Sequence, residues 1–223
     1  MKVVLSLGGS MLFKNNEINV EYVKKFLNVV KNFKGSLALS VGGGTMAREY
    51  VEKAKKLGAN NFEADEIAIE IVKANAKFIA SIIPNAVYCN NFNEANVMFN
   101  DGKIVVLGMA TPGQTSDTTS VLFAEQMEAD RWVNITNVDG VYDKNPKKYK
   151  SAKKFDIISH RELLDIAEIQ DDRKPRENFV IDLLAAKILA RSNIEGHVIN
   201  GSDIEDVKNA INGKVHGGTV ISG

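Results

Sequence analysis

Three short glycine-containing loops each stand between an apolar, strand-like run and a helical pattern. They are Gly8-Gly9-Ser10, Gly42-Gly43-Gly44 and the stretch from Thr111 to Thr119. At such a junction the backbone N–H groups and the positive end of a helix dipole can hold a phosphate. Glycine lets the backbone approach an anion closely because it has no side chain. Three loops of this kind in one chain predict a protein that handles several phosphate groups.

Apolar runs that are typical of strands alternate with helical patterns along the whole chain. Lys2–Leu7 and Ser36–Val41 are the first two runs, and apolar residues recur at helical spacing between them. Further strands are predicted at 86–89, 104–107, 132–136, 197–200 and 219–221, with helices at about 46–57, 65–83, 117–128, 161–169, 178–192 and 203–211. This alternation predicts a largely parallel sheet covered by helices on both faces. Ligands of such sheets bind outside the carboxyl ends of the strands, where all three glycine loops fall.

Composition narrows the class of protein. The 223 residues are 44% hydrophobic and 25% charged, and the formal net charge is zero. A neutral chain has no overall attraction to nucleic acid or to an anionic membrane. Cys89 is the single cysteine, which fits a reducing compartment, and no apolar run is long enough to span a bilayer. We therefore expect a soluble cytoplasmic protein with no nucleic-acid or membrane partner.

The segment from Asp143 to Lys154 differs from the rest of the chain, because it holds six lysines and Pro146 but few apolar residues. It predicts an exposed loop or hairpin of a second lobe, with a boundary near residue 130. A run of like charges is usually a solvated loop. The alternative is that one or two of these lysines contact the phosphates of a nucleotide.

Several familiar catalytic motifs are absent. The chain has no Gly-x4-Gly-Lys-Ser/Thr loop, no Gly-x-Gly-x-x-Gly fingerprint and no Gly-x-Ser-x-Gly elbow. Its histidines, His160, His197 and His216, are scattered and do not have the spacing of metal ligands. We predict no protein-built metal site, and phosphate handling remains the strongest functional signal.

Five sequence blocks occur in an order that resembles the amino-acid kinase family. They are Gly8-Gly9-Ser10, Gly42-Gly43-Gly44 with Arg48, the Thr-Pro-Gly-Gln-Thr-Ser-Asp loop, the run from Thr136 to Tyr142, and the run from Val180 to Lys187. Within the family the order is most similar to the UMP kinases of archaea, and the resemblance runs from Lys2 to about Ile221.

The resemblance implies an α/β fold, namely a three-layer α/β/α sandwich with a central, mostly parallel sheet. It implies a single domain over 1–223, with an acceptor-binding half at about 1–130 and an ATP-binding half at about 131–223. The implied reaction transfers the γ-phosphate of ATP to UMP, giving UDP in pyrimidine nucleotide synthesis, with Mg²⁺ as the cofactor. The partners it implies are ATP, UMP and further copies of the chain, usually in a hexamer.

The resemblance also assigns roles to individual residues. The ATP-binding set is Gly9, Ser10, Gly44, Arg48, Asn137, Tyr142 and Asn145. The UMP-binding set is Gly43, Asp65, Thr111, Pro112, Gly113, Gln114, Thr115 and Ser116. Arg48, Asp117 and Asp182 form the catalytic set, in which the two carboxylates organise the phosphate-binding groups and Mg²⁺. Neither acts as a strong base, since a UMP phosphate is already anionic.

Each charged or aromatic residue in these sets also has an ordinary structural interpretation. Asp65 stands where a long helix is predicted to begin and could be its N-cap, as could Asp117 and Asp182 for theirs. Arg48 could be a solvated helix residue, and Tyr142 a core or hairpin aromatic. These alternatives stay open at the level of sequence.

The chain departs from the family pattern at several positions. They are Ser6, where many relatives have lysine, Thr45, Ala68, Met109-Ala110, Asn145, and Lys174-Pro175-Arg176-Glu177. Two other functions therefore remain open. One is a kinase for another small acceptor, such as isopentenyl phosphate, although the histidine that those relatives carry after the glycine triplet is missing here. The other is a nucleotide-binding sensor with weak catalysis.

Overall fold

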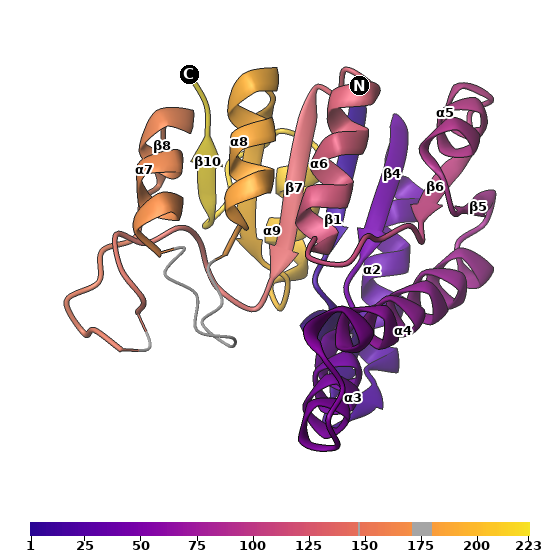
Figure 1. The fold of residues 1–223 in the computed structure, drawn as a ribbon. Helices are drawn as coiled ribbons and strands as arrows, with labels where there is room; N and C mark the ends of the chain where they lie inside the picture. The colour runs from indigo at the N-terminus through magenta and orange to yellow at the C-terminus, as the bar shows by residue number, and fades with distance from the viewer. Residues whose placement is uncertain (147, 171–179) are drawn as a thin grey trace.

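A computed structural model of the chain describes residues 1–146, 148–170 and 180–223 (Figure 1). In chain order the elements are β1 (Lys2–Leu7), α1 (Gly9–Leu12), β2 (Phe13–Lys14), β3 (Glu17–Ile18), α2 (Val20–Asn32), β4 (Ser36–Val41), α3 (Gly44–Lys56), α4 (Asn61–Ile82), β5 (Ala86–Cys89), α5 (Phe92–Asn100), β6 (Ile104–Leu107), α6 (Ser116–Gln126), β7 (Arg131–Thr136), β8 (Ile157–Ile158), α7 (His160–Gln170), α8 (Leu183–Ser192), β9 (Glu195–Asn200), α9 (Ile204–Ile211) and β10 (Thr219–Ile221).

Eight of the strands form one sheet in the order β5-β6-β4-β1-β7-β9-β10-β8. The strands from β5 to β9 in this order are parallel, whereas β10 pairs antiparallel with β9. Helices cover both faces: α6, α7 and α8 lie in front of the sheet in Figure 1, and α2 and α9 lie behind it. The predicted fold class, a three-layer α/β/α sandwich with a mostly parallel sheet, is therefore confirmed.

Alternation along each strand divides the core into two apolar clusters, because successive side chains point to opposite faces. In β1, Val4 packs with α5, α6, α7 and α8, whereas Val3, Leu5 and Leu7 pack with α2 and α9 on the other face. All four side chains are fully buried. Both faces of the strand are thus apolar, which is why the run from Lys2 to Leu7 reads as a continuous hydrophobic stretch.

Polar caps set the beginnings of the helices. Asn60 caps α4 through a capping box, in which its side chain accepts the N–H of Glu63 and the Glu63 carboxylate accepts the N–H of Asn60. The helix therefore begins at Asn61, and the expectation that Asp65 opens it is wrong. Thr115 caps α6, so Asp117 is not that cap, whereas Asp182 does cap α8.

Several short elements lie outside those that the sequence predicts, among them α5, β8 and the pair β2 and β3. Helix α5 begins after its cap Asn91 and buries only Ala95 and Phe99, so its apolar pattern is too sparse to be recognised. The two-residue strands β2 and β3 pair antiparallel next to α1. The described part of the lysine-rich segment forms a loop whose ends meet in one isolated antiparallel bridge between Tyr142 and Lys154.

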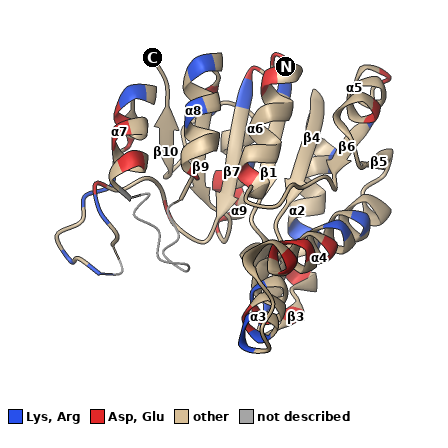
Figure 2. Ribbon diagram, in the orientation of Figure 1, with Lys and Arg blue, Asp and Glu red and all other residues tan. Residues whose placement is uncertain are grey.

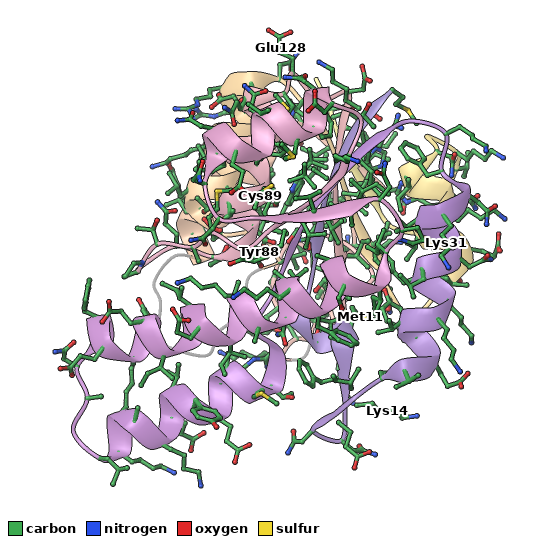
Figure 3. All side chains as sticks on the ribbon, turned by 90° about the vertical axis from the view of Figure 1, so that its right-hand side faces the viewer. Met11, Lys14, Lys31, Tyr88, Cys89 and Glu128 are labelled. Atoms are coloured by element: carbon green, nitrogen blue, oxygen red, sulfur yellow. The ribbon has the colours of Figure 1, made fainter. Side chains whose placement is uncertain are left out.

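The placement of α3 and α4 and the distribution of charge complete the description of the fold. Helices α3 and α4 lie side by side and extend beyond the sheet, which is clearest in the turned view of Figure 3. Acidic and basic residues are interspersed over the helices, and basic residues recur in the described part of the lysine-rich loop (Figure 2). None of the described helices has the length and apolar character of a membrane span.

Candidate active site

The first two glycine loops touch each other through their backbones. A Cβ atom on Gly9 would lie 2.1 Å from the backbone nitrogen of Gly44 and 2.6 Å from the carbonyl oxygen of Gly42. Gly44 itself has a φ of +69°, a conformation that glycine adopts without strain. The Gly42 N–H also donates to the Leu7 carbonyl at 2.9 Å. Glycine on both sides lets the loop after β1 and the loop after β4 form one continuous surface.

A buried asparagine that sequence reasoning missed fixes the second loop. The Asn75 side-chain amide, on α4, donates to the Gly42 carbonyl at 2.9 Å and to the Gly43 carbonyl at 3.4 Å. These two hydrogen bonds tie the second loop to α4 through its carbonyl groups. The signal in the sequence is faint, a polar residue between two alanines inside an apolar helix.

The N-terminus of α3 is left without a side-chain cap. Gly43 stands at the cap position and has no side chain, so the first N–H groups of α3 have no intrahelical partner. The Thr45 hydroxyl oxygen is buried and has no hydrogen-bond partner among the described residues. Arg48 is exposed one turn further on. A phosphate is the kind of group that such a helix end and guanidinium can bind.

Asp65 connects α4 to the third loop. Its carboxylate accepts the backbone N–H of Gly113 at 2.9 Å, across 48 residues of sequence. Gly113 has a φ of +82°, so the turn there favours glycine. Asp65 lies in the second turn of α4, which leaves its carboxylate for tertiary contacts rather than for capping.

The end of the third loop is tied to α8. The Thr115 and Thr118 hydroxyls both donate to the Asp182 carboxylate, the latter at 2.9 Å. Asp182 also accepts the N–H of Ala185 at 2.9 Å as the cap of α8. The cap interpretation of Asp182 is confirmed, and the same carboxylate joins two helix N-termini that are 64 residues or more apart in the sequence.

Asp117 stands between these groups and the sheet. Its carboxylate accepts a hydrogen bond from the Ser6 hydroxyl at 2.6 Å and a longer one from the Asn134 amide at 3.4 Å. Burial, reinforced by the negative charge of Asp182, raises the pKa of Asp117 to about 7, although the two hydrogen bonds oppose the rise. A carboxyl group in this state can be neutral or ionised close to neutral pH.

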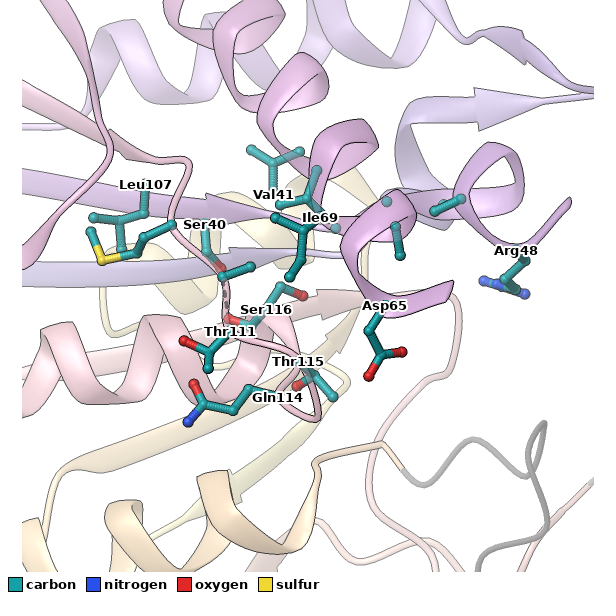
Figure 4. Close-up of a pocket in the computed structure, with 18 residues that line it drawn as sticks. Ser40, Val41, Arg48, Asp65, Ile69, Leu107, Thr111, Gln114, Thr115 and Ser116 are labelled. Carbon is teal, nitrogen blue, oxygen red and sulfur yellow. Dashed lines mark hydrogen bonds between the residues drawn. The ribbon is translucent and has the colours of Figure 1, made fainter. Parts of the chain in front are cut away.

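These elements enclose a cavity of about 250 Å³ (Figure 4). Its lining comes from the ends of β4 and β6, the second loop, α3, α4 and the third loop: Ser40, Val41, Gly42, Gly43, Gly44, Ala47, Arg48, Asp65, Ala68, Ile69, Val72, Leu107, Met109, Ala110, Thr111, Gln114, Thr115 and Ser116. In Figure 4 Leu107 lies at one end of the lining and Arg48 at the other, with Asp65 near Arg48. The cavity thus has an apolar end and a polar, charged end.

Six of the eight residues predicted to bind UMP line this cavity, namely Gly43, Asp65, Thr111, Gln114, Thr115 and Ser116. Pro112 and Gly113 do not line it, but the Gly113 N–H is held by Asp65. The departures Ala68, Met109 and Ala110 are part of the lining. The segment Lys174-Pro175-Arg176-Glu177 lies outside the described residues.

The residues predicted for ATP are more dispersed. Gly9 and Ser10 begin the short helix α1 at the end of β1, and Asn137 follows the neighbouring strand β7. Tyr142 is half-buried and its hydroxyl donates to Asp139 at 2.9 Å, while Asn145 lies in the lysine-rich loop. Of this set only Gly44 and Arg48 line the cavity. The donor roles of all seven stay predictions.

Comparison with known proteins adds an independent result. The model of the amino acid kinase family matches residues 1–200. The chain is 42% identical to the uridylate kinase of Archaeoglobus fulgidus and 38% identical to that of Methanocaldococcus jannaschii, with complete coverage of both chains in each case. The crystal structure of the A. fulgidus uridylate kinase superposes with a TM-score of 0.87 at 40% identity, again over the full length of both chains. The chain therefore belongs to the amino acid kinase family.

Proposed function

We propose that this protein is a nucleoside monophosphate kinase that transfers the γ-phosphate of ATP to UMP, giving UDP. One observation carries the proposal: three stretches far apart in the sequence, Gly42–Gly44, Asp65 and Thr111–Ser116, meet around a single cavity with Arg48 at its margin. Gly43, Asp65 and the Thr111–Ser116 loop are residues that the family resemblance assigns to the acceptor, whereas it assigns Gly44 and Arg48 to the ATP side of the junction. The full-length similarity to uridylate kinases supports the same substrate.

The shape and chemistry of the cavity suit a nucleoside monophosphate. The apolar side chains of Ile69, Val72 and Leu107 offer contact for a planar base. The Asp65 carboxylate is an acceptor only, which matches the two hydroxyl donors of a ribose. The uncapped N-terminus of α3 and the Arg48 guanidinium supply donors and positive charge for the phosphate. Base, sugar and phosphate can each find a complementary group.

We propose that the donor occupies the neighbouring surface beside the first loop, with Gly9, Ser10, Asn137, Tyr142 and Asn145 as its contacts. Phosphoryl transfer demands mainly positioning and neutralisation of charge. In this arrangement Arg48 neutralises charge at the junction of the two nucleotides, and Asp117 and Asp182 hold the surrounding loops and helix ends in place. The acceptor half is then about 1–130 and the donor half about 131–223.

Mg²⁺ enters this proposal with ATP. The described residues contain no group of three or more histidine, cysteine, aspartate or glutamate side chains that could hold a metal ion. An ion carried by the oxygens of the ATP phosphates fits such a site, because Mg²⁺ commonly binds substrate phosphates and water with few protein ligands. When bound, it neutralises phosphate charge. We further propose a cytoplasmic homo-oligomer, hexameric as in the resemblance, that acts in pyrimidine nucleotide synthesis.

A substrate panel tests the proposal. Formation of the phosphorylated product is measured with ATP and each of UMP, CMP, AMP and isopentenyl phosphate, with and without Mg²⁺. We expect UMP to give the highest kcat/KM and turnover to require Mg²⁺. Turnover of isopentenyl phosphate alone would replace the proposal with the other kinase. Calorimetric binding of UMP without any transfer would replace it with a nucleotide sensor.

A further inference from the structure

A row of buried polar side chains crosses the middle of the sheet. Ser6 of β1 is in register with Ser40 of β4 on one side and with Asn134 of β7 on the other. Residues in register on parallel strands point to the same face, which here is the face covered by α6 and α8. The three side chains are at most 3% exposed. The next residues in the row, Leu107 of β6 and Val198 of β9, are apolar.

Each member of this polar row donates a hydrogen bond to the first turn of α6 or to the segment just before α8. The Ser40 hydroxyl donates to the Ser116 carbonyl at 2.9 Å, and the Ser6 hydroxyl donates to the Asp117 carboxylate at 2.6 Å. The Asn134 amide donates to the Val180 carbonyl at 2.8 Å and approaches the other Asp117 oxygen at 3.4 Å. The row therefore holds the first turn of α6 and the approach to the Asp182 cap.

A buried polar row is costly in an apolar core unless every member finds a partner. All three do, and the partners are backbone groups and one carboxylate. Hydrophobic residues at these positions could fill the same space, but they could not define where the Asp117 carboxylate points. Ser6 stands at the centre of the row and makes its shortest contact.

We propose that Ser6, Ser40 and Asn134 form a positioning row for the phosphoryl transfer, with Ser6 orienting the Asp117 carboxylate. The expected effect on kcat rests on the proposed function, whereas the expected effect on the Asp117 carboxylate does not. None of the three residues needs to touch a nucleotide, because each acts through the helix end or the carboxylate that it holds. Asp182 is the one charged side chain among the described residues that also acts on Asp117.

The kinetic experiment compares Ser6→Ala with the unmodified protein. Removing the hydroxyl leaves the Asp117 carboxylate without its shortest hydrogen bond, so we expect kcat to fall on the order of 10-fold to 100-fold, the scale of a small misplacement in an active site. The KM for UMP should stay within about 2-fold, because the cavity lining is unchanged. If Ser6→Ala only reduced the fraction of folded protein, the rates at all UMP concentrations would fall by the same factor, and the thermal melt would show the loss of stability.

Two variants separate positioning from general damage to the core. Ser6→Thr keeps a hydroxyl at the same atom and should restore most of kcat, and Ser6→Cys serves as a second small replacement if Ser6→Ala does not fold. Ser120→Ala is the matched control. Its hydroxyl is equally buried on α6 but contacts the Trp132 ring nitrogen and the Asp117 backbone carbonyl, not the carboxylate. Equal losses of kcat in Ser120→Ala and Ser6→Ala would overturn the inference.

A spectroscopic measurement tests the row without any substrate. The carboxyl ¹³C resonance of Asp117, identified by its disappearance in Asp117→Asn, should move in Ser6→Ala and return in Ser6→Thr. A resonance that is the same in Ser6→Ala and the unmodified protein would overturn the positioning role, whatever the turnover. If that resonance moves as expected while the unmodified protein fails to phosphorylate UMP, the proposed function fails and the positioning row stands.

Discussion

Asp65 has one carboxylate oxygen engaged with the Gly113 N–H, and its other oxygen has no hydrogen bond among the described residues. A carboxylate half occupied in this way both holds the third loop and presents an acceptor to the cavity. The same side chain is half-buried, so it is accessible to a ligand without being free to rotate into bulk water.

The first prediction concerns this residue. Asp65→Ala should raise the KM for UMP on the order of 10-fold to 100-fold and change kcat less, because it removes an interaction that ground state and transition state share. Initial rates at several UMP concentrations measure it. Glu66→Ala, an exposed carboxylate next along α4, is the control and should leave both constants unchanged. A normal KM in Asp65→Ala would remove Asp65 from the acceptor site.

A second prediction follows from the pKa of Asp117, which burial raises to about 7. The ordinary pKa of aspartate is about 3.9, so between about pH 4 and 7 the folded protein binds a proton at Asp117 that the unfolded chain has lost. Stability therefore falls as the pH rises through this window. Asp117→Asn, which cannot ionise, should gain stability over the unmodified protein as pH rises from 4.5 to 7.5.

Urea unfolding of both proteins at several pH values measures this difference, and a difference that does not change with pH would contradict the raised pKa. At the same scale, sequence alone could predict that most residues of the proposed acceptor site lie together, because they stand in contiguous motifs. It could not place Asn75, Thr118 or Asn134, since their roles depend on which carbonyl or carboxylate the fold brings beside them.

At the scale of elements, the contact between the first and second loops leaves no room for a side chain. A third prediction is that Gly9→Ala destabilises the protein by about 2 kcal/mol or more, since its Cβ would overlap the Gly44 backbone and both loops must shift. Thermal or urea unfolding measures the loss, and any remaining kinase activity should fall with it.

Gly102→Ala is the matched control for that experiment. Gly102 has a φ of +76° and nothing within 4 Å of a built Cβ, so its substitution carries backbone strain without a clash. Its cost should be about 1 kcal/mol, as for an alanine forced to a positive φ. A smaller loss in Gly9→Ala than in Gly102→Ala would show that the loops can separate easily.

Most strands and helices were predictable, because apolar periodicity and glycine punctuation are local signals. Ala86–Cys89, Ile104–Leu107 and Thr219–Ile221 agree with the structure to the residue. Helix starts were less predictable, as α4 shows, because Asn60 and Asp65 are both acceptable caps and only the capping box with Glu63 favours the first. Register between strands has no local signal, so the row formed by Ser40, Ser6 and Asn134 could not be foreseen.

At the scale of the whole molecule, a histidine pair joins β9 to the segment before β10, with His197 buried and His216 half-buried. The His197 ring nitrogens lie 2.7 Å from His216 Nε2 and 2.9 Å from Glu195 Oε1, and Arg131 of β7 donates to the same Glu195 oxygen at 2.7 Å. The Gly218 N–H donates to the remaining ring nitrogen of His216 at 3.1 Å. The four side chains connect β7, β9 and the chain leading into β10.

Burial, helped by the nearby Arg131 and His216, lowers the pKa of His197 to about 4 against the opposing effect of Glu195. The ordinary pKa of histidine is about 6.5, so between about pH 6.5 and pH 4 the unfolded chain binds a proton at His197 that the folded protein does not bind. The free energy of unfolding therefore falls as the pH falls through this window. The fourth prediction is that His197→Gln weakens this acid dependence. The effect has the opposite sign to that of Asp117, so each needs its own variant.

The same urea series at pH 4.5, 5.5, 6.5 and 7.5 measures the fourth prediction. Relative to the unmodified protein, His197→Gln should gain stability toward pH 4.5. An unchanged profile would mean that His197 is protonated as readily in the folded protein as in the unfolded chain.

The place of β1 in the sheet has one more consequence. This strand is hydrogen-bonded to β4 on the acceptor side and to β7 on the donor side, so the two proposed halves share a strand and have no hinge between them. Amide hydrogens of Val4 and Leu5 can then meet solvent only when the whole sheet opens, and deuterium should replace them at the rate of global unfolding. The loops at the carboxyl ends of the strands should exchange far sooner, and we expect any motion that admits a nucleotide to be confined to them.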